Sequence, residues 1–230
     1  MMPNRLLAVD AVSVQRVFSG PAEDVVALDA VDLAVPTGAM HAVMGRSGSG
    51  KTTLLNLVGA LDQPTAGAIT VYGERVDGLN GSAAARWRAR SLGFVFQAHA
   101  LMPSMTALEN VELAMRIAGH SRHTSHDRSR EALERVGLGD RLDHRPAQLS
   151  GGQRQRVAVA RAIAPGNRLL LADEPTAGLD SSASADVFTL LRSLVDYSSV
   201  TVLMATHDPL TLDFVDSAVE LRNGVLAEPV

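Results

Sequence analysis

The 230-residue chain contains no cysteine, which excludes disulfides and thiolate metal sites and fits a reducing compartment. Aromatic residues make up only 3% of the chain, so each one is of interest, including Phe18, for which ordinary core packing is the alternative. The formal net charge is −4, which gives no basic surface of the kind that binds nucleic acid. We therefore expect no nucleic-acid partner.

Long hydrophobic runs are also absent, since no apolar stretch approaches the roughly 18 residues of a membrane span. Residues 1–12 carry one arginine and a short apolar run that Asp10 interrupts, unlike a secretory signal. We expect a cytoplasmic protein, and any membrane role would depend on a partner.

The most informative stretch that is present reads GRSGSGKT and spans Gly45–Thr52, a full match to the phosphate-binding pattern G-x-x-x-x-G-K-[ST]. An apolar run, Met40–Met44, precedes it and a helix-like run, Thr52–Ala60, follows. Strand, loop and helix in this order are the context that the pattern requires. The alternative, a glycine-rich turn without function, is disfavoured because every position of the pattern is filled.

The chemistry of this loop predicts a bound nucleoside triphosphate. Glycines let backbone N–H groups approach a polyphosphate, and the following helix adds its positive N-terminal end. Lys51 would reach the β- and γ-phosphates, and the Thr52 hydroxyl would bind Mg²⁺. The predicted nucleotide contacts in this loop are Gly45, Arg46, Ser47, Gly48, Ser49, Gly50, Lys51, Thr52 and Thr53.

The remaining pattern predicts an α/β fold. Residues 5–35 alternate apolar and polar positions, which predicts antiparallel strands with a loop at Ser19–Asp24. Apolar runs at 92–96, 169–173 and 200–205 read as buried strands of a parallel sheet. The fold class is therefore a P-loop α/β core with an N-terminal antiparallel β subdomain.

A helical segment interrupts this core. Thr106–Glu109 forms a capping box that begins one helix, and Arg130–Val136 predicts another, with no strand between them. We assign residues 1–97 and 156–230 to the core with its antiparallel subdomain, and 98–155 to an inserted helical subdomain. Both belong to one domain, 1–230.

Three histidines, His120, His123 and His126, lie between these two helices at a spacing of three. A metal site is one interpretation. A polar connector is favoured, because no thiol or carboxylate cluster accompanies the histidines.

A second helix start follows at Leu149–Gln153, which reads LSGGQ. Ser150 occupies the N-cap position, and Gly151 and Gly152 leave the backbone open, so this helix start could also receive an anion. A capped helix start without function is the alternative. The chain thus carries two anion-receptive helix starts.

Polar residues stand at the carboxyl ends of the predicted strands, where parallel sheets bind ligands. Asp173 would bear on Mg²⁺, which leaves the adjacent Glu174 free to polarise a water molecule. Gln97 and His207 end two further strands. An acid pair at a solvated strand end is the alternative, and the neighbouring phosphate loop disfavours it.

In this combination of motifs the chain resembles the nucleotide-binding subunit of ATP-binding cassette (ABC) transporters. The resemblance covers nearly the whole chain and rests on GRSGSGKT, Gln97, LSGGQ, LLLADEP at 169–175, Gly178-Leu179-Asp180 and His207. The segments FVFQ, LMPSMTALENV and HRPAQLSGGQRQRVAVARA look similar to the branch of macrolide exporters, lipoprotein-release ATPases and the cell-division ATPase.

The resemblance implies a RecA-like core and two copies that meet head to tail around two ATP molecules. Each ATP would lie between the phosphate loop of one copy and residues Ser150, Gly151, Gly152 and Gln153 of the other. Phe18 would stack on adenine, in place of the more frequent tyrosine. Gln97 would contact Mg²⁺ and the attacking water, His207 the γ-phosphate, and Asp180 would link the two sites. The resemblance thus implies an ATPase with Glu174, His207, Gln97 and Lys51 in catalysis and Thr52, Gln97 and Asp173 around Mg²⁺.

The resemblance further implies a membrane permease as partner, which would hold the chain at the inner face of the cell membrane. The permease would export a substrate, extract lipoproteins or lipids, or transmit force. We expect it to dock on the apolar loop that contains Leu101, Met102, Pro103 and Met105, although packing within the helical insertion is the alternative for Leu101. Two other classes of protein are the alternatives. A non-transport ABC ATPase of translation or DNA repair would carry two cassettes or long coiled coils, and a small-molecule kinase would have no use for LSGGQ.

Overall fold

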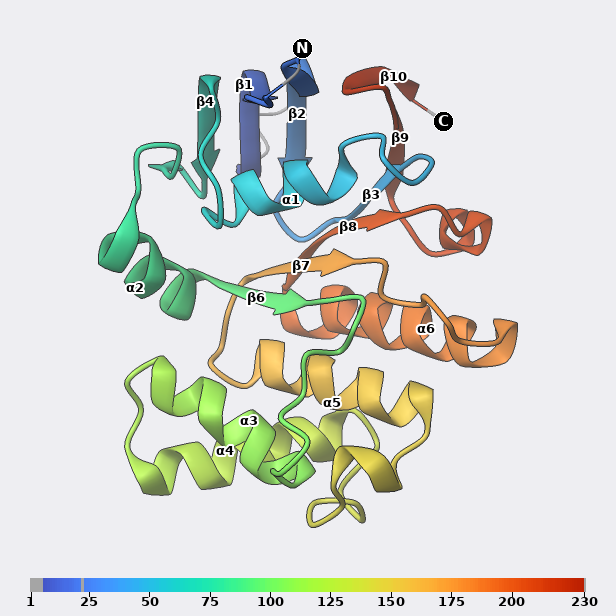
Figure 1. Ribbon diagram of the computed structural model, residues 1–230. Coiled ribbons are helices and arrows are strands. Elements are labelled where there is room, and N and C mark those ends of the chain that lie inside the picture. Colours follow the sequence, from blue (N-terminus) through green and yellow to red (C-terminus); the bar gives the residue numbers. More distant parts are fainter. Residues whose placement is uncertain (1–5, 22, 230) are drawn as a thin grey trace.

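A computed structural model describes residues 6–21 and 23–229. The first five residues of the N-terminal stretch compared above with a secretory signal lie outside this range. The centre of the molecule is a six-stranded sheet in the order β10-β9-β3-β8-β7-β6 (Figure 1). Its strands are β3 (Met40–Met44), β6 (Leu92–Val95), β7 (Leu169–Asp173), β8 (Thr201–Thr206), β9 (Ser217–Arg222) and β10 (Val225–Pro229). All neighbouring strands are parallel except β9 and β10.

The parallel strands are short apolar runs because both faces of the sheet are covered. Along β7, Leu170 and Ala172 pack into one buried cluster, and Leu169 and Leu171 pack into the other. A strand buried on both faces has no polar alternation, so its sequence shows a continuous apolar run. The predicted parallel strands are confirmed.

A second sheet, in the order β2-β1-β4-β5, lies at the edge of the molecule beyond helix α1 (Figure 1). It consists of β1 (Leu7–Phe18), β2 (Val25–Pro36), β4 (Ala66–Val71) and β5 (Glu74–Arg75), all antiparallel. Strands β1 and β2 alternate between buried and more exposed positions, as predicted for a sheet with one covered face.

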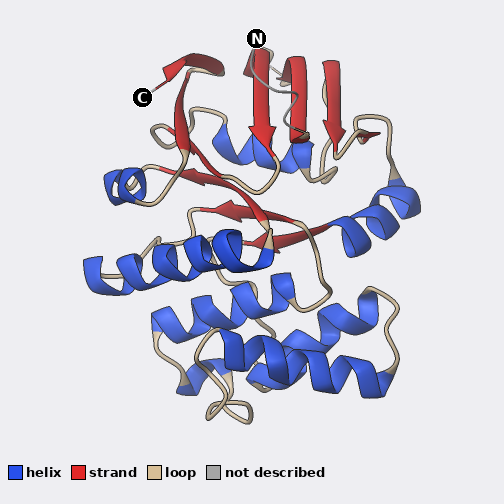
Figure 2. Ribbon diagram, turned by 180° about the vertical axis from the view of Figure 1, so that it is seen from behind, coloured by secondary structure: helices blue, strands red, loops and turns tan. Residues whose placement is uncertain are grey.

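Six α-helices are present among the described residues, and α3 to α6 gather on one side of the central sheet (Figure 2). Their bounds are α1 (Lys51–Val58), α2 (Gly81–Ser91), α3 (Ala107–Ile117), α4 (Arg122–Arg135), α5 (Gly151–Ile163) and α6 (Ser181–Ser198), and two short 3₁₀ helices span Pro146–Gln148 and Pro209–Asp213. Helices α3 and α5 begin with complete capping boxes, at Thr106 with Glu109 and at Ser150 with Gln153. These two helix starts were predicted from the sequence.

Helix α4 corrects one expectation. It begins at Arg122 rather than near Arg130, so His123 and His126 lie on a helix and not in a polar connector. Its covered face is made partly of Ser125 and Ser129, which are almost fully buried, and a helix that buries serines shows little apolar periodicity.

The histidines on α4 pair with single carboxylates. The imidazole of His123 lies 3.4 Å from the Asp127 carboxylate, and that of His126 lies 2.8 Å from Glu112. Within the described part of the chain, no group of three or more histidine, aspartate and glutamate side chains could hold a metal ion.

The proposed boundary at residue 155 falls inside α5, which is one continuous helix. The buried side chains of α5 belong to the same cluster as those of α3 and α4 and as one face of β7 and β8. Because α5 packs on both parts, the helical segment and the core are joined by a shared buried cluster.

Candidate functional site

A hollow of about 330 Å³ lies where the phosphate loop meets the carboxyl ends of β7 and β8. Its walls come from β2, the phosphate loop, the start of α1 and the ends of β6, β7 and β8. The lining residues are Val25, Val26, Ala27, Ser47, Gly48, Gly50, Lys51, Thr52, Thr53, Gln97, Glu174 and His207. The structure therefore brings together residues that are far apart in the sequence and that were predicted to share one site.

The phosphate loop has the backbone that its glycines permit. Gly50 caps α1 in a left-handed conformation, with φ 107°, and a Cβ atom there would lie 2.4 Å from the carbonyl oxygen of Ala27. A side chain at Gly45 would meet the carbonyl oxygen of Leu221 at 2.4 Å. These two positions require glycine because the loop passes too close to neighbouring backbone for any Cβ.

Lys51 is buried, with 6% of its surface exposed, and its ammonium group folds back onto the loop. The ammonium donates to the carbonyl oxygens of Gly45, at 2.7 Å, and Arg46, at 3.0 Å. It also lies 3.5 Å from the Glu174 carboxylate. The loop thus presents a positive charge that is fixed in place at one wall of the hollow.

Thr52 and Asp173 form an oxygen pair beside this charge. The Thr52 hydroxyl lies 2.9 Å and 3.2 Å from the two Asp173 carboxylate oxygens. Burial raises the pKa of the Asp173 carboxyl, the hydrogen bond from Thr52 opposes that shift, and the neighbouring Glu174 charge adds to it. A cation at this point would favour the ionised form of Asp173.

Glu174 is held in an uncommon backbone conformation. Its φ is 47°, and its N–H donates to the carbonyl oxygen of Ala205 on the neighbouring strand. One carboxylate oxygen faces Lys51, and the other lies 2.9 Å from Nδ1 of His207. The side chain therefore projects into the hollow between a lysine and a histidine.

Four of the nucleotide contacts predicted around the phosphate loop do not line this hollow, namely Gly45, Arg46, Ser49 and Phe18. Arg46 is exposed on the loop, and the Ser49 hydroxyl is buried with no hydrogen-bond partner among the described residues. Phe18 is 41% exposed at the end of β1 and pairs across the hairpin with Val25, which does line the hollow. Val25 and Val26 were not predicted from the sequence, although two adjacent valines directly after the loop were a signal there.

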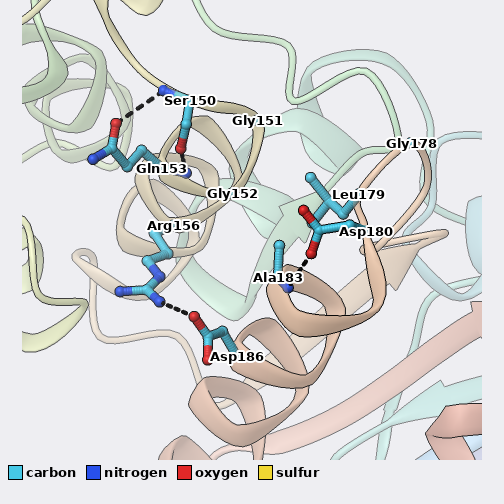
Figure 3. A pocket seen from close by; sticks show the side chains of 10 residues that line it. All are labelled: Ser150, Gly151, Gly152, Gln153, Arg156, Gly178, Leu179, Asp180, Ala183 and Asp186. Atoms are coloured by element: carbon cyan, nitrogen blue, oxygen red, sulfur yellow. Dashed lines mark hydrogen bonds and ion pairs between the residues drawn. The ribbon is translucent and has the colours of Figure 1, made fainter.

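A second hollow, of about 410 Å³, lies at the start of α5 (Figure 3). It is lined by Ser150, Gly151, Gly152, Gln153, Arg156, Gly178, Leu179, Asp180, Ala183 and Asp186. Asp180 caps α6 by accepting from the N–H of Ala183 at 2.8 Å, a contact that the sequence analysis did not predict. An ion pair of 2.9 Å between Arg156 and Asp186 ties α5 to α6.

Among the residues that the structure describes, none lines both hollows. The first contains the phosphate loop with the acid pair and His207, and the second contains the LSGGQ helix start with Asp180. Within one chain the two predicted anion-receptive helix starts therefore do not line a common cavity.

Comparison with known proteins places this arrangement in a family. The family model described as ABC transporter matches residues 28–177. The lipoprotein-releasing system ATP-binding protein LolD of Anaeromyxobacter dehalogenans is 50% identical over 198 residues, which cover 86% of this chain and 83% of that protein. LolD of Shewanella denitrificans is 42% identical over 97% of this chain and 95% of that protein. The macrolide export ATP-binding/permease protein MacB of Salmonella choleraesuis is 43% identical over 92% of this chain, but over only 33% of its own length.

The solved structures agree. The dimeric structure of the bacterial ABC transporter cassette MJ0796 superposes with a TM-score of 0.88 at 35% identity, covering 96% of this chain and 97% of that one. A post-hydrolysis state of the same cassette, bound to ADP and Pi, gives 0.88 at 36% identity over the same shares of both chains. These matches confirm the predicted fold class, the named branch and the activity class, an ABC-transporter ATPase.

Among the helices of the described residues, none is both long enough and apolar enough to cross a bilayer.

The family model covers more than half of the chain, and the two LolD proteins are 50% and 42% identical to it over most of their length. The chain therefore belongs to the ABC transporter family.

Proposed function

We propose that this chain binds Mg²⁺–ATP in the hollow at the phosphate loop and that two copies close around two ATP molecules to drive a membrane permease. The observation that carries the proposal is the single cavity that Lys51, Thr52, Glu174 and His207 share, with Asp173 bonded to Thr52. In each closed site, the second hollow of one copy would cover the phosphates bound to the other.

The chain's residues fit Mg²⁺. Thr52 and Asp173 offer oxygen ligands within hydrogen-bond distance of each other, and Gln97, which lines the same hollow, adds an amide oxygen. Mg²⁺ prefers such oxygen ligands and bridges phosphate oxygens in nucleotide sites. When bound, the ion would neutralise phosphate charge beside the lysine.

Glu174 is the proposed general base. Its carboxylate projects into the hollow, and it is not one of the residues proposed to hold Mg²⁺, so it is available to accept a proton from an attacking water. His207 would hold Glu174 on one side and contact the γ-phosphate on the other, and Lys51 would neutralise the phosphates. Phe18, beside Val25, would stack on the adenine ring.

The proposed partner is a permease of the lipoprotein-releasing type, and the chain would sit at the inner face of the membrane through it. The support is that the relatives this chain nearly spans end to end are ATP-binding proteins of lipoprotein-releasing systems. The macrolide-export relatives make an exporter the second candidate.

The proposed docking loop has a defined position. Met102 is 46% exposed, whereas Leu101 packs against the helical cluster. An apolar hollow of about 320 Å³ is lined by residues that flank this loop in the sequence, among them Phe96, Ala100, Leu113 and Ile117. Gln97 of the nucleotide hollow lies in the same segment, between Phe96 and Ala100, so a change at the nucleotide could be transmitted to the partner.

Replacing Glu174 by glutamine tests the function. The amide keeps the shape but cannot accept the proton, so turnover should fall at least ~10²-fold while ATP still binds. The variant should also accumulate as a dimer in ATP, because the closed pair is no longer opened by hydrolysis. Steady-state ATPase and size-exclusion measurements check both expectations.

The matched control is Glu131→Gln, the same change at an exposed position on α4. It should leave turnover and oligomeric state unchanged. Near-normal ATPase of Glu174→Gln would remove Glu174 as the base, and an inactive wild-type protein would contradict the proposed function itself.

A further inference from the structure

Phe18 has one face already occupied. The guanidinium carbon of Arg16 lies 4.3 Å from the centroid of the Phe18 ring, a distance typical of a cation–π contact. The Phe18 residue is still 41% exposed. A planar ring has two faces, and the arginine covers one of them.

Arg16 is itself fixed in position. Its Nε and Nη2 atoms donate to the two carboxylate oxygens of Asp62, at 2.9 Å and 3.0 Å, in a bidentate pair. The Asp62 carboxylate also accepts from the N–H of Gln63 at 2.8 Å. Two parallel hydrogen bonds define the plane of the guanidinium group as well as its position. The plane of the cation over the ring is therefore set by the turn that contains Asp62.

This turn is linked to the phosphate loop through helix α1. Asp62 follows α1, and the N–H of Leu61 donates to the carbonyl oxygen of Asn56 within that helix at 2.8 Å. Lys51 is the first residue of the same helix. The hydroxyl of Thr65, further along the turn, accepts from the N–H of Val17 at 3.0 Å. The turn thus connects the helix of the phosphate loop to the strand that carries Phe18.

We propose that Arg16 is a positioning residue for the nucleotide base. It holds the Phe18 ring so that the other face receives adenine at a distance set by the Asp62 turn from the phosphates on Lys51. This inference rests on the proposed function, since it requires Phe18 to stack on the base.

The physical reason is preorganisation. A phenylalanine at the end of a strand has no hydroxyl with which to anchor its ring, unlike a tyrosine. Without Arg16 the ring would sample several orientations and would lose this freedom when the base binds. A fixed ring avoids that loss, so Arg16 should improve base binding without touching the phosphates.

The alternative is that the Arg16–Asp62 pair only stabilises the packing of the antiparallel sheet on the core. ADP and inorganic tripolyphosphate distinguish the two roles, because both bind at the phosphate loop and only ADP carries a base. In Arg16→Met, we expect the Kd for ADP to rise about 5- to 10-fold and the Kd for tripolyphosphate to change less than ~2-fold. In steady state the KM for ATP should rise, and kcat should stay within ~2-fold.

Three further variants sharpen the test. Arg16→Lys keeps a charge but loses the bidentate pair, so it should weaken ADP binding by an intermediate factor. Arg16→Met in a Phe18→Leu background should add no further loss, because the ring through which it acts is gone. Arg75→Met removes the similar bidentate pair with Asp77 on the same sheet and should change neither Kd.

Calorimetric titration with both probes measures these constants. Equal losses for ADP and tripolyphosphate in Arg16→Met would overturn the inference in favour of a role in sheet packing alone. Unchanged ADP binding in Arg16→Met, with a loss in Phe18→Leu, would overturn it while leaving base stacking intact. A wild-type protein that binds neither probe would instead contradict the proposed function.

Discussion

At the scale of single residues, Glu174 has a strained backbone conformation and His41 is a buried titratable side chain. Glu174 adopts a left-handed backbone with φ 47°, a conformation that costs a non-glycine residue about 1–3 kcal/mol. The hydrogen bond from its N–H to Ala205 on β8 holds it there. The carboxylate consequently points between Lys51 and His207, the position that the proposed general base would occupy.

His41 on β3 shows the effect of burial and carries a prediction about pH. Burial lowers the pKa of its imidazole from 6.5 to about 4, and its Nε2 has no hydrogen-bond partner among the described residues. Between pH 6.5 and about 4, the imidazole of His41 therefore binds a proton in the unfolded chain but not in the folded chain. The free energy of unfolding should fall as the pH drops from 6.5 towards 4, by about 3 kcal/mol in total, and this contribution should be complete above pH 6.5.

Denaturant unfolding of the wild type and of His41→Gln between pH 4 and 8 measures this effect. The variant cannot take up the proton, so the difference in unfolding free energy between the two proteins should vary with pH across this window. A difference independent of pH would show that His41 is not buried as a neutral side chain. The other histidines affect the unfolding free energy of both proteins equally, so their effect cancels in the difference.

At the scale of elements, several hydrogen bonds hold the loop before α3, although its Met102 side chain is exposed. The buried amide of Asn110 donates to the carbonyl oxygens of Met102, Met105 and Thr106 and accepts from the N–H of Met102. The proposed docking loop requires such a connection if a displacement of Gln97 is to reach a bound partner. This contact of Asn110 was not predicted from the sequence.

Glutamate at both Met102 and Met105 should therefore release the protein from membranes that contain its permease. Its fold and basal ATPase should stay largely intact, because the nucleotide hollow is lined by other residues. Membrane flotation with ATPase measurement checks this, and Tyr197→Glu, a charge at an exposed side chain on α6, is the control. Retained membrane binding and normal transport in the double variant would refute the docking loop.

Some elements of the fold could be predicted from local sequence patterns, and others could not. The capping boxes at Thr106 and Ser150 and the apolar run of β7 each follow from local rules, so they could be predicted. The start of α4 could not, because its covered face consists partly of serines. The pairing of Arg16 with Asp62 joins residues 46 positions apart, and no local pattern encodes it.

At the scale of the whole molecule, the chain carries two hollows with different chemistry at the same edge of the fold. In Figure 1 the strands β6, β7 and β8 point towards this edge, and α5 and α6 begin there. One hollow has the lysine and the carboxylates, and the other has a capped helix start that no phosphate-loop residue lines. In two copies related by a twofold axis, the first hollow of each copy would face the second hollow of the other. The dimer would then have two sites, and each copy would contribute one half of each site.

The most direct test of this account mixes two inactive variants. Lys51→Ala disables the phosphate loop and Gly152→Asp disables the LSGGQ helix start. A Cβ atom at Gly152 would lie 3.7 Å from that of Ala183, an ordinary contact, so the fold should tolerate the side chain. Homodimers of either variant carry one defect in each site and should be inactive.

Mixed dimers should contain one site with both defects and one intact site. In an equimolar mixture we expect roughly a quarter of the wild-type ATPase rate, since about half of the dimers are mixed and each has one working site. Differently tagged chains verify that mixed dimers form in ATP. Recovered activity on mixing is the predicted result, and mixed dimers that form but hydrolyse no ATP would contradict sites shared between two copies.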